Sequence, residues 1–190
     1  MPMGPSLRAA LPEAILPLDE SRLFRPVNIA LLTVSDTRNL DTDTSGDLLA
    51  QRVQAAGHVI ADRAILRDDT ALITARLHNW IDDENIDVVI STGGTGLTGR
   101  DVTPEALDRV KTKDIPGFGE LFRWLSFASI GTSTIQSRAC AVVARGTYIF
   151  ALPGSNGAVK DGWDQILVHQ LDSRHRPCNF VELMPRLRET

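Results

Sequence analysis

The chain alternates short apolar runs with amphipathic segments, and this alternation constrains its fold more than any other feature. Residues 27–35 (VNIALLTVS), 58–66 (HVIADRAIL) and 86–92 (IDVVIST) are short, rich in β-branched side chains and typical of buried strands. Between them, residues 44–57 and 70–85 place apolar side chains at helical spacing. An order of strand, helix, strand, helix, strand predicts a parallel sheet with right-handed crossovers.

The second half of the chain predicts further helices and two more strands. The pattern predicts helices at 103–111 and 118–130, two strands within 138–154 that join at Arg145-Gly146, and a last helix at 155–171. We expect one α/β domain over residues 26–190 and an extension over residues 1–25. The predicted helix caps are Thr44, Asp68 or Asp69, and Ser155 or Asn156.

The extension differs from the domain because four prolines interrupt any helix in it. It lacks a basic start followed by an unbroken apolar run, so a signal peptide is not predicted. Its apolar side chains are too many for a typical disordered tail. Disorder and docking, on its own domain or on a neighbouring subunit, both stay open. These apolar residues are Leu11, Ile15, Leu16, Leu18, Leu23 and Phe24.

The charge and cysteine content exclude several kinds of partner. A net charge of -4, with 23% charged residues of mixed sign, provides no basic face for nucleic acid. No apolar run reaches the roughly 20 residues that span a bilayer, so no membrane segment is expected. Cys140 and Cys178 have neither metal-ligand nor redox spacing, which favours a reducing compartment. We expect a cytoplasmic protein with a small ligand.

Residues 91–107, STGGTGLTGRDVTPEAL, place four glycines directly after the third predicted strand. Glycine permits positive φ angles, so the backbone N–H groups of such a loop can turn toward one anion. A helix from Thr103, with Pro104 in its first turn, would add its positive end. The spacing matches neither G-x-G-x-x-G nor a P-loop. A phosphate site and a simple tight turn both fit this composition.

A carboxylate beside this loop suggests a cation. Asp101 follows the glycines, and a carboxylate next to a bound phosphate is unfavourable unless a cation lies between them. Mg²⁺ commonly takes one or two carboxylates together with substrate phosphates. Asp68 and Asp69 follow the second strand and so belong to the same edge of the sheet. Helix capping is the alternative role for each of the three.

Two other stretches converge on that edge. Residues 131–139, GTSTIQSRA, offer hydroxyl groups and the guanidinium of Arg138, although a plain polar loop is the alternative. Residues 152–162, LPGSNGAVKDG, turn at Pro153-Gly154 and open a helix that carries Lys160. Two anion-type turns on one edge suit a pair of ligands, or one ligand phosphorylated at both ends. The hydroxyl residues are Thr132, Ser133, Thr134 and Ser137.

Seven stretches together resemble a known family. They are TVSDTR, DTSG, STGGTGLTGRDVTPEAL, PGFGELFR, GTSTIQSR, FALPGS and RPCNF. In this order they are similar to the molybdopterin-biosynthesis family that includes MoaB, MogA and the G domain of gephyrin. The likeness covers roughly residues 26 to 180 and is strongest to the MoaB branch. Several motifs in register are far more specific than one glycine loop.

The resemblance implies a three-layer α/β/α sandwich with a mostly parallel central sheet. It also implies a substrate, molybdopterin, which is a pterin dithiolene with a terminal phosphate. Active relatives adenylylate molybdopterin with Mg-ATP and release pyrophosphate, so ATP, molybdopterin and Mg²⁺ are the expected partners. The resemblance leaves open a non-catalytic molybdopterin-binding carrier or regulator. A weaker possibility is the nucleotide pyrophosphatase activity of the related CinA-type domain.

The resemblance also assigns roles to residues. Asp68 and Asp101 become the catalytic aspartates that hold Mg²⁺ through the substrate phosphates. The implied substrate and phosphate-binding residues are Asp36, Gly93, Gly94, Thr95, Gly96, Ser137, Pro153, Gly154 and Ser155. Leu97 and Thr98 depart from the more polar residues of some MogA sequences, which leaves adenylyl specificity open.

Family members form trimers, and MoaB proteins often form hexamers as dimers of trimers. The apolar segment FGELFRWLSFASIG, residues 118–131, could supply such an interface. Trimer and hexamer both stay open. Trp80, Trp124 and Trp163 are interpreted as core or interface aromatics rather than pterin-stacking residues.

Overall fold

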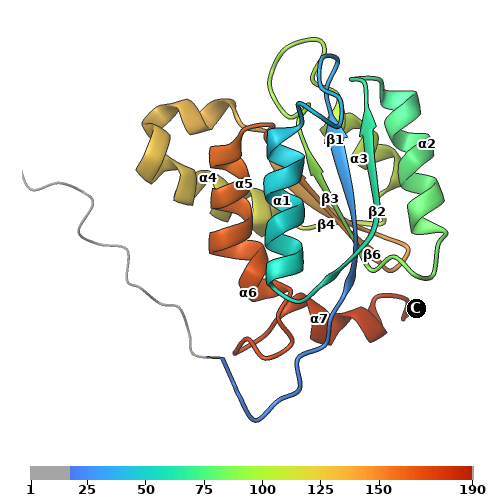
Figure 1. Cartoon of the computed structure of the whole chain (residues 1–190), viewed down its shortest axis with the longest axis vertical. Coiled ribbons are helices and arrows are strands. Elements are labelled where there is room, and N and C mark those ends of the chain that lie inside the picture. The colour runs from blue at the N-terminus through green and yellow to red at the C-terminus, as the bar shows by residue number, and fades with distance from the viewer. Residues whose placement is uncertain (1–17, 190) are drawn as a thin grey trace, which may run out of the picture.

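A computed structural model describes residues 18–189 of the chain. One six-stranded sheet, in the order β2-β1-β3-β6-β5-β4, forms its centre (Figure 1). β2, β1, β3 and β6 run parallel, whereas β5 is antiparallel to both of its neighbours. The strands are β1 (Asn28–Val34), β2 (Val59–Leu66), β3 (Val88–Thr92), β4 (Lys113–Asp114), β5 (Cys140–Ala144) and β6 (Thr147–Leu152).

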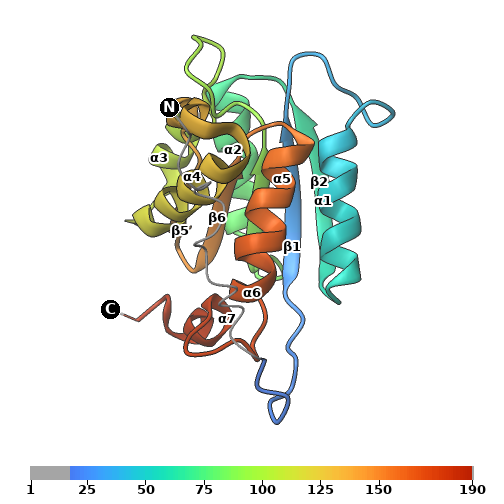
Figure 2. The ribbon, with the colours of Figure 1, turned by 90° about the vertical axis from the view of Figure 1, so that its left-hand side faces the viewer.

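Helices cover both faces of the sheet and produce three layers (Figure 2). One face packs against α1 (Thr44–Ala55), α4 (Pro116–Ile130) and α5 (Asn156–Gly162). The other face packs against α2 (Thr70–Ile81) and α3 (Thr103–Val110). The remaining elements are η2 (Gly131–Gln136), η3 (Trp163–Leu167), α6 (Val168–Gln170), α7 (Phe180–Leu183) and η4 (Met184–Arg186). The three-layer α/β/α sandwich with a mostly parallel sheet is confirmed.

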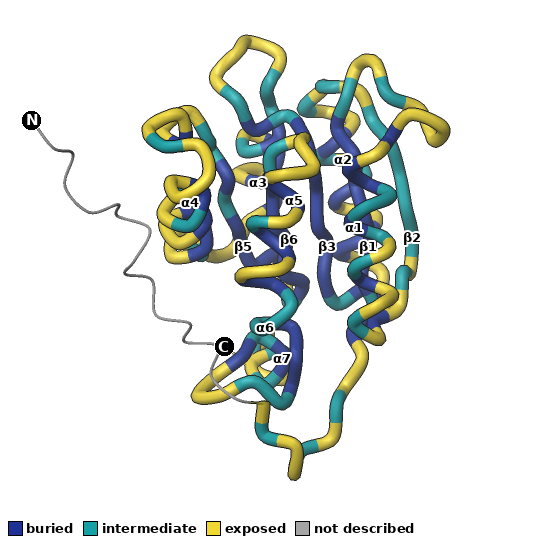
Figure 3. Tube along the Cα trace, turned by 60° about the vertical axis from the view of Figure 1, so that its left-hand side comes forward, coloured by how far each residue is buried: buried dark blue, intermediate teal, exposed yellow. Residues whose placement is uncertain are grey.

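Alternation along each strand divides the core in two. In β6, Tyr148 and Phe150 face the α1, α4 and α5 layer, while Ile149 faces the α2 and α3 layer. Successive strand side chains point to opposite faces, so a strand covered on both sides must be apolar at every position. All six residues of β6 are buried, which Figure 3 shows for the central strands. The unbroken apolar runs of the sequence therefore correspond to central strands.

The structure corrects one predicted helix and adds one strand. Residues 155–171 do not form one regular α-helix, because a π-helical turn, η3, separates α5 from α6. The two-residue strand β4 was not predicted. It pairs with β5 through Lys113 and Asp114, which are too few and too polar to produce a periodic signal.

The caps follow the predictions in two helices of three. Asp69 caps α2 by accepting from the N–H groups of Ala71 and Leu72, and Ser155 caps α5. At α1 the predicted cap, Thr44, is wrong. Asp43 caps this helix instead, because its carboxylate reaches the N–H of Gly46 at 3.0 Å.

Residues 18–25 lie against the chain's own domain. The hydroxyl of Ser173 donates to the carbonyl of Leu23 at 3.0 Å and accepts from the N–H of Arg25 at 2.9 Å. The ring of Phe24 lies 5.2 Å from that of His58, and Arg22 pairs with Glu182. This part of the predicted extension is docked, while residues 1–17 lie outside the described residues.

Two long loops gather at one end of the sheet. In Figures 1 and 2, the loop after β1 and the glycine loop after β3 project from the same end. Residues 18–26, α6 and α7 occupy the opposite end. Within residues 18–189, no helix combines the length and apolarity that a membrane crossing requires. The loop-bearing end is the carboxyl edge of the parallel strands, where such sheets bind ligands.

Candidate functional site

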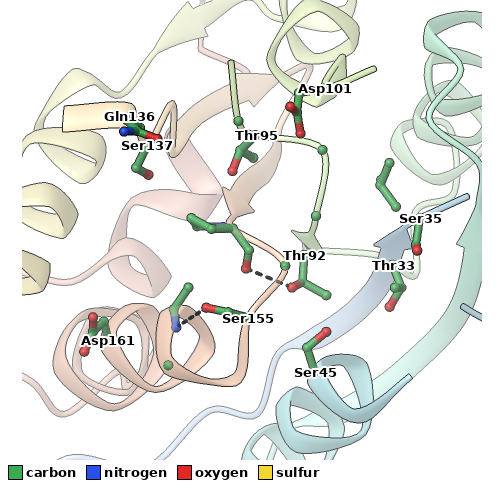
Figure 4. Close-up of a pocket in the computed structure, with 18 of the residues that line it drawn as sticks. Thr33, Ser35, Ser45, Thr92, Thr95, Asp101, Gln136, Ser137, Ser155 and Asp161 are labelled. Carbon is green, nitrogen blue, oxygen red and sulfur yellow. Dashed lines mark hydrogen bonds between the residues drawn. The ribbon is translucent and has the colours of Figure 1, made fainter. Parts of the chain in front are cut away.

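A cavity of about 800 Å³ opens at this carboxyl edge (Figure 4). Its walls come from the ends of β1 and β3, from the loops that follow β1, β2, β3 and β6, and from α1, α4, η2 and α5. Figure 4 shows Thr95 and Asp101 on one side, Ser155 on another, and Ser137 on the η2 side. Segments far apart in the sequence thus enclose one volume, large enough for a drug-sized molecule.

The glycine loop is held by contacts that only glycine allows. Gly93 and Gly94 have φ angles of 107° and 64°, and a Cβ on Gly93 would overlap the carbonyl oxygen of Val34. The N–H of Gly93 donates to the carbonyl of Leu152 at 2.9 Å. Thr103, the first residue of α3, donates its hydroxyl to the carbonyl of Gly93 at 2.9 Å. The loop is therefore fixed between two strand ends and a helix start.

The second turn, residues 153–155, lies directly against the first. The hydroxyl of Thr92 donates to the carbonyl of Pro153 at 3.1 Å, and a Cβ on Gly154 would lie 3.1 Å from the Cα of Gly93. Ser155 accepts from the N–H of Ala158 at 3.1 Å and so begins α5. Both predicted anion turns consequently face the same cavity.

Arg138 stabilises the glycine loop by donating hydrogen bonds to its backbone carbonyls. Its Nε donates to the carbonyl of Gly96 at 2.7 Å, and its Nη2 donates to the carbonyl of Asp101 at 2.8 Å. Its own N–H donates to the carbonyl of Thr95 at 3.0 Å, and its guanidinium pairs with Glu105. Because those donors are occupied by protein groups, Arg138 supports the loop rather than presenting a free cation to the cavity.

Asp101 is held as a carboxylate at the rim of the cavity. The hydroxyl of Thr98 donates to its Oδ2 at 2.6 Å, and the N–H of the same residue donates at 2.9 Å. These bonds, the hydroxyl first, hold the pKa of Asp101 below its ordinary value. A carboxylate that stays ionised is suited to a cation.

Asp68 experiences the opposite electrostatic environment. Burial, followed by the nearby charges of Asp36 and Asp101, raises the pKa of Asp68 above its ordinary value. Asp36 forms a bidentate ion pair with Arg100, whose Nε donates to Oδ2 at 2.9 Å and whose Nη2 donates to Oδ1 at 2.7 Å, and this pair lowers the pKa of Asp36. Within residues 18–189, Asp68 forms no ion pair of its own and lies close to two other carboxylates, although the charge of Arg100 partly offsets them. Such an arrangement favours a bound divalent ion.

Asp43 is a fully buried carboxylate beneath the cavity. Burial by itself would raise its pKa, but Thr33 at 2.6 Å, Arg63 at 2.9 Å and the N–H of Gly46 outweigh burial, so the pKa is lowered. Arg38 approaches the same carboxylate at 3.5 Å. Arg38 also donates to the hydroxyl of Ser45 and, at 3.1 Å, to the carbonyl of Gly154. This network ties the start of α1 to the second turn.

Comparisons with known proteins identify the family of the chain. The model of a family described as a probable molybdopterin binding domain matches residues 30–173. Molybdenum cofactor biosynthesis protein B of Escherichia coli (strain K12) is 50% identical over 157 residues, which cover 83% of this chain and 92% of that protein. The chain belongs to the MoaB/MogA family. Its function lies in molybdenum cofactor biosynthesis, and its domain is a molybdopterin-binding domain.

Solved structures place the chain in the same fold. A crystal structure of molybdenum cofactor biosynthesis protein B has a TM-score of 0.79 and 34% identity, covering 89% of this chain and 100% of that one. The tungsten cofactor synthesizing protein MoaB from Pyrococcus furiosus has a TM-score of 0.71 and 31% identity, covering 87% and 99%. The described part of this MoaB/MogA-family chain thus matches nearly the full length of each.

Of the eleven site residues that the resemblance assigns to this MoaB/MogA-family chain, all but one line the cavity. The exception is Asp36, whose carboxylate is held outside the lining by Arg100. Among the predicted polar residues of 131–139, only Thr134 and Ser137 reach the lining. The predicted residues that line it are Asp68, Gly93, Gly94, Thr95, Gly96, Asp101, Ser137, Pro153, Gly154 and Ser155.

Sequence reasoning missed the far wall and the floor of the cavity. Arg38 and Ser45 line it beside the second turn, and Ser126 and Asp161 line it where α4 meets α5. A signal existed for Ser45, since the DTSG stretch contributes to the family resemblance. Ser126 and Asp161 lie within helical segments, where a polar residue normally indicates a solvent-facing position.

Proposed function

We propose that this chain adenylylates molybdopterin with Mg-ATP, giving adenylyl-molybdopterin and pyrophosphate. The observation that carries the proposal is the pair of anion-type turns, residues 93–96 and 153–155, on one cavity with Asp68 and Asp101. Adenylyl transfer must bring two phosphorylated substrates together. One cavity with two phosphate turns and ionised carboxylates provides the groups that this reaction needs.

In this reaction the molybdopterin phosphate attacks the α-phosphorus of ATP, and pyrophosphate leaves. The chain then has to position phosphates and stabilise charge, without a side-chain nucleophile of its own. The backbone of the glycine loop holds one phosphate, and the turn at 153–155 holds the other. Arg138 and Thr103 keep the glycine loop rigid through the bonds described above.

The donor set of Asp68 and Asp101 fits Mg²⁺. Within residues 18–189, no three His, Cys, Asp or Glu side chains gather as a complete metal site. Mg²⁺ does not require one, because it is often held by one or two carboxylates together with substrate phosphates and water. When bound, Mg²⁺ would neutralise phosphate charge. The carboxylates of Asp68 and Asp101 would hold it in the cavity.

The test is pyrophosphate release from Mg-ATP with fresh molybdopterin, for the wild type and Asp101→Asn. We expect the variant to lose at least ~100-fold in turnover, as when one transition-state charge contact is removed. Molybdopterin binding should persist, because the glycine loop remains. Asp69→Asn is the matched control, since Asn also caps a helix and Asp69 lies outside the cavity lining.

Two other outcomes would contradict parts of this proposal. Saturable molybdopterin binding without pyrophosphate release would leave a non-catalytic carrier or regulator. Full activity in Asp101→Asn would show that this carboxylate has no role in holding Mg²⁺.

We also propose that the chain forms a homo-oligomer, as a trimer or a dimer of trimers, through α4. Apolar side chains on α4 and η2 are exposed in the single chain, among them Trp124 at 59% and Ile135 at 81%. The outer face of α4 is exposed along much of its length in Figure 3. Exposed apolar patches of this kind mark interfaces. The further apolar members are Leu121, Phe127 and Ile130.

A further inference from the structure

The cavity continues beyond the two phosphate turns toward α4 and α5. There the lining changes from backbone turns to side chains, which include apolar groups, the hydroxyl groups of Ser126 and Ser129, the amine of Lys160 and one acidic group, Asp161. Figure 4 shows Asp161 on α5, across the cavity from Asp101. Within the described chain, Asp161 is the one acidic lining residue that does not belong to the glycine-loop side. The apolar members of this wall are Phe122, Ile130 and Ala158.

The carboxylate of Asp161 is oriented by neutral donors. The hydroxyl of Ser126, which is 2% exposed, donates to Oδ2 at 2.8 Å, and the amide of Gln165 donates to Oδ1 at 3.1 Å. Ser129 approaches Oδ2 at the weak distance of 3.5 Å. Within residues 18–189, no cation pairs with Asp161. A carboxylate has about four acceptor positions, so each oxygen retains one for a ligand.

A flat ligand with two adjacent N–H donors matches this wall. A carboxylate can accept from such a pair at once, with one N–H on each oxygen. Pterin presents that pair, as the 2-amino group and the neighbouring ring N–H. Adenine presents the N–H of its 6-amino group next to a ring nitrogen acceptor, which a carboxylate would repel. Phe122, Ile130 and Ala158 offer an apolar face for the ring itself.

We propose that Asp161 recognises the pterin ring of the substrate through its 2-amino group and the adjacent ring N–H. The inference rests on the proposed function and adds a specificity-determining residue to it. Ser126 and Gln165 position the carboxylate, and the phosphate turns hold the other end of the substrate. The nucleotide base then occupies a different part of the cavity.

The experiment compares two probes, pterin and lumazine, which carries a 2-oxo group in place of the 2-amino group. Binding to the full chain is measured by titration calorimetry for the wild type, Asp161→Asn and Asp161→Glu. The wild type should prefer pterin by about 10- to 100-fold, the range for a hydrogen bond to a charged group. Asp161→Asn should reverse this preference, because an amide donates to the 2-oxo group and still accepts from the ring N–H.

Controls separate recognition from folding. Asp161→Glu keeps a carboxylate and should keep the preference for pterin. Asp164→Asn alters the same helix outside the cavity, where Asp164 pairs with Arg52, and should change neither affinity. The inference would be overturned by any of three results. The wild type could bind the two probes equally, the wild type could fail to bind pterin, or Asp161→Asn could lose affinity for both probes equally.

The inference and the proposed function can fail separately. A chain that selects pterin through Asp161 but releases no pyrophosphate refutes adenylyl transfer and retains the recognition. A chain that releases pyrophosphate while Asp161→Asn leaves the pterin preference unchanged refutes only the recognition.

Discussion

At the scale of single residues, burial and two nearby carboxylates make the charged form of Asp68 unfavourable for the fold. Its raised pKa means that the folded chain binds the proton more tightly than the unfolded chain does. The free energy of unfolding therefore falls as the pH rises above the ordinary carboxylate value and through the raised pKa. At neutral pH, Asp68 is charged, poorly solvated and close to Asp36 and Asp101. Functional sites commonly trade stability for activity in this way.

Asp68→Asn should therefore melt at a higher temperature than the wild type at pH 7 and lose turnover. A gain of 1 kcal/mol would raise the Tm by roughly 2–4 °C in a chain of this size. The difference should shrink as the pH falls through the raised pKa of Asp68 and the carboxyl group takes up its proton. Thermal melts across this range check the prediction. Asp101→Asn should instead lower the Tm at pH 7, because the pKa of Asp101 is lowered in the folded chain. A Tm difference between Asp68→Asn and the wild type that does not change with pH would contradict the raised pKa of Asp68.

At the scale of elements, the loop between β3 and α3 depends on backbone shape more than on side chains. Gly93 has a φ of 107° and would press a Cβ against Val34, whereas Gly99 has no atom within 4 Å of a Cβ position. Gly93→Ala should cost about 2–4 kcal/mol, from backbone strain and overpacking together. Gly99→Ala should stay within about 0.5 kcal/mol of the wild type. Urea denaturation measures both, and equal effects would show that the loop is not fixed as described.

At the scale of the whole molecule, the exposed face of α4 borders the cavity, because Ile130 is exposed on this face and also lines the cavity. Trp124→Lys with Phe127→Lys should shift the chain to a monomer, because charges replace apolar side chains at the proposed interface. Sedimentation velocity measures the state. Leu72→Lys is the control, as Leu72 is 43% exposed on α2 in the opposite layer. A wild-type monomer, or an oligomer that persists in the double variant, would refute this interface.

The interpretation of aromatic residues also belongs to this scale. Trp80 and Trp163 are 3% and 2% exposed, which confirms them as core residues. Trp124 is exposed in the single chain, so its interface role stays a prediction. Helical spacing alone does not separate these cases, because an apolar residue can face either its own core or another subunit.

The sequence by itself determined five of the six strands, most helix starts and the two turns at 93–96 and 153–155, because each depends on local properties. Unbroken β-branched runs must be covered on both faces, and Gly93 must take a conformation closed to other residues. Only the tertiary structure decided that Arg100 withdraws Asp36 from the cavity, that Asp43 is buried beneath it, and that Asp161 lines its far wall. Those positions depend on contacts between segments 10 to 64 residues apart. No local periodicity encodes such contacts, since they form only when the layers pack.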